Sequence, residues 1–137
     1  MLTEPECIKL NKALEETMVG HLGIKVVPTE DADTVTALMP INNKTKQYFG
    51  ILHGGASLAL AETLAGVGSV CHVGIDKKIC GTNVTANHVH MSPTEGNVKA
   101  VASPIHIGKS MHVWNVDISA EDGTLISTAR VTNIILD

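Results

Sequence analysis

The segment that decides the fold is residues 53–75, HGGASLALAETLAGVGSVCHVGI. Its centre is rich in Ala and Leu, which favour an α-helix, and Gly74 stands where a helix commonly ends. The pattern therefore predicts a helix from about Gly54 to Val73. A helix that is apolar on nearly all sides needs burial over most of its surface. A curved antiparallel sheet wrapped around it would supply that burial.

The segments on either side of this helix predict the strands of that sheet. Before it, apolar residues at helical spacing indicate an N-terminal helix over about residues 5–18, and two strands follow at roughly 21–27 and 34–39. After it, apolar and polar residues alternate in period two, which is typical of strands. Turn-forming residues at 93–96 and 121–123 predict that these last four strands are consecutive antiparallel neighbours.

The whole chain of 137 residues is expected to form a single α+β domain. Its predicted order is an N-terminal helix within residues 1–18, two strands, the long central helix and four further strands. The sheet would then have five to six strands wrapped around the helix. We find no internal repeat and no linker that would divide the chain into two domains.

Composition and charge argue against nucleic-acid and membrane partners. The net charge is −4, and the few aromatic residues (Tyr48, Phe49 and Trp114) offer no platform on which bases could stack. The N-terminus has no basic segment before an apolar run, so no signal peptide is expected. The central helix could pass for a membrane span, but a carboxylate at its middle is costly in lipid. The three cysteines lack paired spacing, which fits reduced thiols in a cytoplasmic protein.

Glu62 is the leading candidate for a catalytic residue. No ionised side chain precedes it back to Lys46, and none follows until Asp76. A carboxylate buried in apolar surroundings is costly unless it is hydrogen-bonded, paired or working, for example as a general base. The alternative is that Glu62 lies on an exposed stripe of the helix. No other charged residue stands at helical spacing to extend such a stripe.

The helix entrance, His53-Gly54-Gly55, is the second candidate. Free N–H groups at a helix N-terminus carry a partial positive charge, and glycine lets a ligand approach the backbone. Such a site can polarise a carbonyl group and stabilise the oxyanion of an acyl-transfer step. Paired glycines also make ordinary turns, so they do not indicate a site by themselves. The combination of a glycine-rich helix start with an acidic residue about two turns further along the helix is the more specific indication of an acyl-transfer site.

The other reactive residues form no recognised catalytic pattern. The chain has no G-x-S-x-G, GxGxxG or Walker motif, and Ser57 and Ser69 lack an evident base. His88 and His90 are predicted to share one face of a strand, where they could bind a metal or form a polar cross-strand pair. We expect no metal site, because no third ligand stands at readable spacing.

Residues 44–63, KTKQYFGILHGGASLALAET, strongly resemble the glutamate-using hotdog-fold thioesterases of the phenylacetate and 4-hydroxybenzoyl-CoA type. Segments 87–89, 107–108 and 113–114 also fit the bacterial branch that contains the 1,4-dihydroxy-2-naphthoyl-CoA and enterobactin proofreading thioesterases. The similarity covers nearly the whole chain from about Met18 onward. It implies a hotdog fold and hydrolysis of an acyl-CoA, aroyl-CoA or acyl-carrier-protein thioester to the free acid and thiol.

The resemblance also implies a role for each candidate residue. Glu62 would attack the thioester carbonyl or activate a water, and the Gly54 N–H would polarise the C=O group. Gln47 and His53 would orient the thioester and the leaving group. Further substrate contacts would come from Gly55, Thr63, His88, His90, Gly108 and Lys109. Of these, the two histidines would line the acyl or pantetheine side, and the lysine would meet a CoA phosphate.

In this family the site lies between two subunits, so the resemblance implies a homodimer or homotetramer. It implies no metal or redox cofactor, because coenzyme A is part of the substrate. One departure from the family is Gly66, where many members carry Ser or Thr to hold the hydrolytic water. This departure keeps open the alternative of a non-catalytic acyl-CoA binding or sensing protein.

Overall fold

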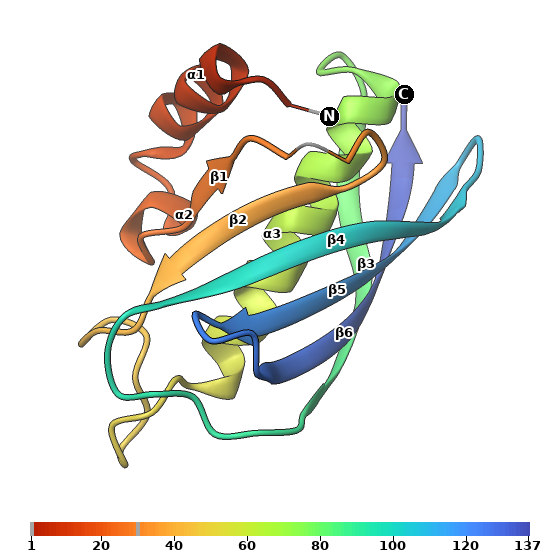
Figure 1. The fold of residues 1–137 in the computed structure, drawn as a ribbon. Coiled ribbons are helices and arrows are strands. Elements are labelled where there is room, and N and C mark those ends of the chain that lie inside the picture. Colours follow the sequence, from red (N-terminus) through yellow and green to blue (C-terminus); the bar gives the residue numbers. More distant parts are fainter. Residues whose placement is uncertain (1, 30) are drawn as a thin grey trace.

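Six strands form one antiparallel sheet around a long helix in the computed structural model, which describes residues 2–29 and 31–137 (Figure 1). The helices are α1 (Glu4–Leu14), α2 (Met18–His21) and α3 (Gly54–Val73). The strands are β1 (Lys25–Val27), β2 (Val35–Pro40), β3 (Lys78–His88), β4 (Asn97–Ile107), β5 (Met111–Ala120) and β6 (Leu125–Leu136). Their order in the sheet is β1-β2-β4-β5-β6-β3. The predicted α+β architecture is confirmed.

Helix α3 has the bounds that the sequence predicts, because both of its ends are specified locally. The His53 side chain caps its first turn, and Gly74 ends it with a φ of 88°, a region that favours glycine. The face toward the sheet is completely buried at Leu60 and Leu64. By length and composition α3 could cross a membrane, yet half of its most apolar stretch is buried inside the fold, as in the core helix of a sheet protein.

The sheet approaches α3 closely at Gly68. A Cβ atom added there would lie 2.6 Å from Cη2 of Trp114, which is the largest fully buried side chain of the described residues. Cores are packed too densely for such a ring to move aside. The glycine at position 68 therefore sets how closely helix and sheet can approach.

The N-terminal prediction is wrong in detail. Helix α1 ends at Leu14 rather than Met18, a short helix α2 follows it, and the first strand starts at Lys25 rather than His21. Thr17 explains the break, because its hydroxyl donates to Leu14 O (2.6 Å) and accepts from the Val19 N–H (3.2 Å). Beyond this break, Asn11 of α1 bonds both backbone groups of Val26 at 2.9 Å, so α1 covers part of the edge strand β1.

The prediction that the last four strands are consecutive neighbours is wrong for β3 and β4. β3 lies at the sheet edge beside β6, whereas β4 lies between β2 and β5. The turn at 93–96 belongs instead to a link that passes below the start of α3 in Figure 1. Among the bonds that hold this link, the Leu52 N–H donates to Ser92 Oγ (2.7 Å), and the Ile41 N–H donates to Gly96 O (2.8 Å).

Candidate active site

The start of α3 presents a backbone donor to solvent. His53 is the N-cap, and its Nδ1 accepts the Gly55 N–H at 2.8 Å. Nδ1 is thus an acceptor, which leaves the proton of the neutral ring on Nε2, available for donation. Within residues 2–29 and 31–137, the Gly54 N–H has no acceptor. The cap therefore uses the second glycine of the pair and leaves the first free for a ligand.

His88, at the end of β3, lies against this helix start. A Cβ atom on Gly54 would lie 2.5 Å from His88 Nε2, so the ring occupies its place only because residue 54 is glycine. The other ring nitrogen, Nδ1, is 2.7 Å from the hydroxyl of the buried Ser127 on β6. Ser127 fixes the ring, and this residue carries no signal in the sequence because it meets His88 through long-range strand pairing.

Gln47 reaches the same place from the loop before α3. Its side-chain Oε1 accepts the Phe49 N–H, and its backbone carbonyl accepts the Gly50 N–H at 3.0 Å, so the loop folds tightly on itself. A cavity of about 360 Å³ is lined by Gln47, Gly54, His88 and His90 together with neighbouring residues. The structure thus brings these four predicted site residues together.

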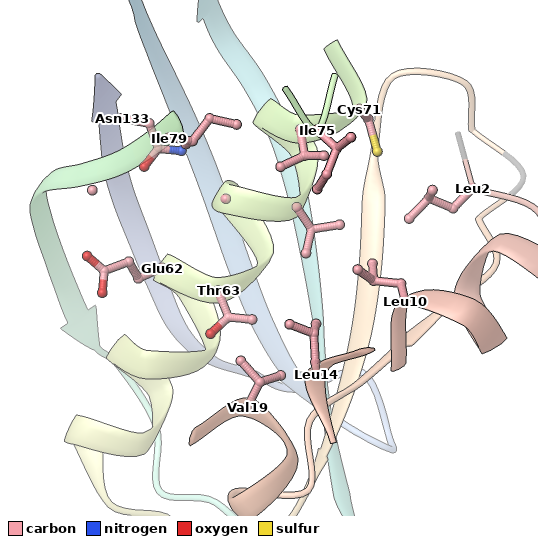
Figure 2. Close-up of a pocket in the computed structure, with 14 residues that line it drawn as sticks. Leu2, Leu10, Leu14, Val19, Glu62, Thr63, Cys71, Ile75, Ile79 and Asn133 are labelled. Carbon is pink, nitrogen blue, oxygen red and sulfur yellow. The ribbon is translucent and has the colours of Figure 1, made fainter. Parts of the chain in front are cut away.

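Glu62 lies elsewhere, on the face of α3 that the sheet leaves uncovered. The expectation of a buried carboxylate is wrong for the single chain, because Glu62 is exposed. Its Oε1 lies against the backbone of β3, since a Cβ atom on Gly81 would come within 2.3 Å of it. Glu62 and Thr63 line a second cavity of about 500 Å³ over the exposed face of α3 (Figure 2).

One chain therefore holds the predicted site in separate pieces. Gly54 and Glu62 are about 12 Å apart along the axis of α3 and line different cavities. Gly108 and Lys109 lie in the turn between β4 and β5, where the Gly108 N–H donates to Met111 O at 2.9 Å. Because β5 starts beside the end of β6, this turn is at the opposite end of the sheet from Gly54.

Comparison with known proteins identifies the family. The model of the thioesterase superfamily matches residues 49–127. This chain belongs to the thioesterase superfamily. It is 44% identical over 128 residues to the 1,4-dihydroxy-2-naphthoyl-CoA hydrolase of Escherichia coli, covering 93% of this chain and 92% of that protein. It is also 39% identical to the proofreading thioesterase EntH of Cronobacter sakazakii, over 93% of this chain and 91% of the relative.

The fold of this thioesterase is that of its relatives. The crystal structure of the Haemophilus influenzae thioesterase HI1161 matches 100% of this chain and 92% of that chain, with a TM-score of 0.91 and 34% sequence identity. The hotdog fold and the enzyme class expected from the resemblance are confirmed. The relatives are hydrolases and thioesterases by name, so a non-catalytic binding protein is not favoured.

His90 does not share a strand face with His88 in the thioesterase, contrary to the prediction. β3 ends at His88, and the chain turns so that His90 Nδ1 lies 2.8 Å from Met91 O. The two rings still line one cavity. Among the described residues, no group of three potential metal ligands is found.

Ser69 is hydrogen-bonded to a histidine after all, although the sequence gives it no evident base. Its Oγ lies 2.9 Å from His112 Nδ1, and both residues are completely buried. Burial, aided by the neighbouring His72, lowers the pKa of His112. Because both side chains are completely buried, we assign this pair to the core of the thioesterase rather than to its chemistry.

Proposed function

We propose that this thioesterase hydrolyses an acyl-CoA, aroyl-CoA or acyl-carrier-protein thioester to the free acid and thiol. The observation that carries the proposal is the free Gly54 N–H at the start of a 20-residue helix, in a position to polarise a thioester carbonyl. The CoA thioester named in the E. coli relative supports the substrate class. The thioester and water would be the only reactants, and no cofactor would take part.

Glu62 would supply the second half of the chemistry. Either its carboxylate attacks the carbonyl carbon to form an anhydride that water then hydrolyses, or it takes a proton from an attacking water. In both routes the C–S bond breaks, the water oxygen ends in the acid, and a proton goes to the thiolate. Gln47 and the Nε2–H of His53 would orient the thioester, and Lys109 would meet a CoA phosphate as a point charge.

We further propose that two subunits complete each site through β3. This strand is an open sheet edge of 11 residues, which favours pairing with a second copy. In antiparallel self-pairing centred between Val84 and Thr85, Gly81 of one strand would stand opposite His88 of the other. Glu62, which touches Gly81, would then face the helix start of the partner subunit.

The first test is release of free thiol from benzoyl-, naphthoyl- and straight-chain acyl-CoA. We expect Glu62→Gln, which keeps the shape but removes the charge, to lose roughly a thousandfold or more in kcat. Melting temperatures of the two proteins should agree, since Glu62 is exposed. Equal rates for wild type and variant would overturn the role of Glu62.

The second test separates a shared site from a site within one chain. Glu62→Gln and the double variant Gln47→Ala/His53→Ala are unfolded together in urea and refolded as a mixture. Half of the dimers would pair one chain of each kind, and each would hold one intact site, so about a quarter of wild-type activity should return. No recovery, with mixed dimers demonstrated by native mass measurement, would contradict the shared site.

A further inference from the structure

The cavity beside Glu62 extends well beyond what attack on a carbonyl requires. It holds about 500 Å³ and spans the exposed face of α3 from β3 to α1 (Figure 2). Glu62 and Asn133, two of its polar groups, stand on the β3 side, and Thr63 stands on α3 between them and the apolar wall of α1. Most of the rest is aliphatic, with Leu10, Leu14, Val19, Val70, Ile75 and Ile79 in the lining. We call this cavity the α1 groove.

Helix α1 is held as a wall of the groove rather than collapsing onto α3. Cys7 anchors it in the core with 3% exposure, and Asn11 bonds it to β1. At its start, Thr3 and Glu6 form a reciprocal capping box, with the Thr3 N–H donating to Glu6 Oε2 at 2.8 Å. The buried Cys7 and the Asn11 bonds hold α1 against the core and the β1 edge, and a space remains between α1 and α3.

Gly66 widens the groove midway along α3. A Cβ atom at this position would meet no atom within 4 Å, so the space that a side chain would fill is empty. From Glu62 to Cys71, α3 rises about 14 Å. The groove therefore offers a continuous apolar path of that length, starting at the proposed catalytic carboxylate.

We propose that the α1 groove binds the acyl part of the substrate as an extended aliphatic chain of medium length. This inference rests on the proposed function, which puts the thioester carbon beside Glu62. The lining has aliphatic side chains and no aromatic ring to stack on an aroyl group. An aroyl group would fill only the end near Glu62 and leave the part beside α1 empty. Burial of apolar surface in that part would then contribute nothing to binding.

The experiment compares kcat/KM for butanoyl-, octanoyl- and dodecanoyl-CoA below their micelle concentrations, with benzoyl-CoA as reference. Each methylene buried in an apolar site raises kcat/KM by up to about fourfold, so we expect at least about a hundredfold increase from butanoyl to dodecanoyl. A flat profile with chain length, together with loss of activity in Glu62→Gln, would overturn the groove and leave the proposed function standing.

Gly66→Leu tests the position of the chain. The added side chain fills open space, so it should lower kcat/KM for dodecanoyl-CoA at least about tenfold and change butanoyl-CoA less than about twofold. Ala13→Leu is the matched control, because it places the same leucine side chain on the exposed face of α1, outside the groove. Equal losses for both substrates in Gly66→Leu would contradict the proposal.

Thiol labelling decides the question even without turnover. Cys71 lines the far part of the groove and is exposed, whereas the exposed Cys80 does not line it and serves as an internal reference. In Glu62→Gln, bound dodecanoyl-CoA should slow alkylation of Cys71 at least about fivefold, with butanoyl-CoA and Cys80 showing no such effect. Unchanged labelling of Cys71 under saturating dodecanoyl-CoA would refute the groove as the acyl site.

Discussion

Ser69→Ala tests whether a buried polar cluster fastens α3 to the sheet. Ser69 Oγ accepts the Trp114 Nε1–H and the Asn133 Nδ2–H, both at 3.0 Å, which uses both of its acceptor sites. Its own O–H therefore donates to His112 Nδ1 at 2.9 Å. All four residues are at most 1% exposed, so the hydroxyl is satisfied entirely by side chains of β5 and β6.

Removing this oxygen would leave two donors and one acceptor unpaired in the core. Each unsatisfied buried polar group costs about 1–3 kcal/mol, so the three together should lower the free energy of unfolding by roughly 3–9 kcal/mol. A domain is commonly stable by about 5–15 kcal/mol. The loss is thus large enough to bring Ser69→Ala close to unfolding at physiological temperature.

Urea unfolding followed by fluorescence measures this loss directly, because Trp114 is the only tryptophan and a member of the cluster. Protein concentration is kept fixed, since association would add to the apparent stability. Ser119→Ala, on the outer face of β5, is the matched control and should change the free energy by less than about 0.5 kcal/mol. A loss below about 1 kcal/mol in Ser69→Ala would refute the argument from unsatisfied groups.

Three further predictions concern Gly68, Gly54 and His112. Gly68→Ala should destabilise by about 2 kcal/mol in the same assay, because the new Cβ would clash with the buried Trp114 ring; unchanged stability would mean that helix and sheet can separate. Gly54→Ala should lower kcat roughly a hundredfold, because the added methyl displaces the His88 ring from the helix start; the broken bond to the buried Ser127 should cost about 1–3 kcal/mol of stability, and an unchanged kcat would contradict the role of the helix start. Because burial lowers the pKa of His112, the unfolded chain takes up a proton before the folded protein as the pH falls. The free energy of unfolding should therefore decrease below about pH 6.5, the ordinary histidine value, and a rise there would be inconsistent with a buried neutral ring.

The parts of the fold that follow from the sequence are those with local causes. Helix α3 begins and ends where His53 and Gly74 dictate, and the strands after it follow their period-two alternation. The break between α1 and α2 was missed because it depends on one residue, Thr17, whose hydroxyl bonds the end of α1 and the start of α2. The place of β3 was missed because pairing between distant strands leaves no short-range pattern.

The residues of the candidate site also differ in whether local sequence could reveal them. Gln47 and Gly54 are close in sequence and line one cavity, and His53 is the N-cap next to Gly54, so a motif found the three together. Ser127 and Gly81 touch site residues only through the sheet and could not be found that way. The exposure of Glu62 could not be predicted from the sequence either. An isolated charge on an apolar helix is compatible with a carboxylate buried inside one chain and with a helix face that a second chain covers.

The rigidity of α3 is what makes a second subunit necessary to the proposed chemistry. Gly54 and Glu62 are fixed on one helix about 12 Å apart, and no rotamer of a glutamate spans that distance. Bending α3 between them would break the packing at Leu60, which is completely buried. A thioester polarised by Gly54 therefore lies out of reach of Glu62 from the same chain. The open edge of β3 lies beside both residues, since Gly81 touches one and His88 the other, and so offers the route by which a partner could close the gap.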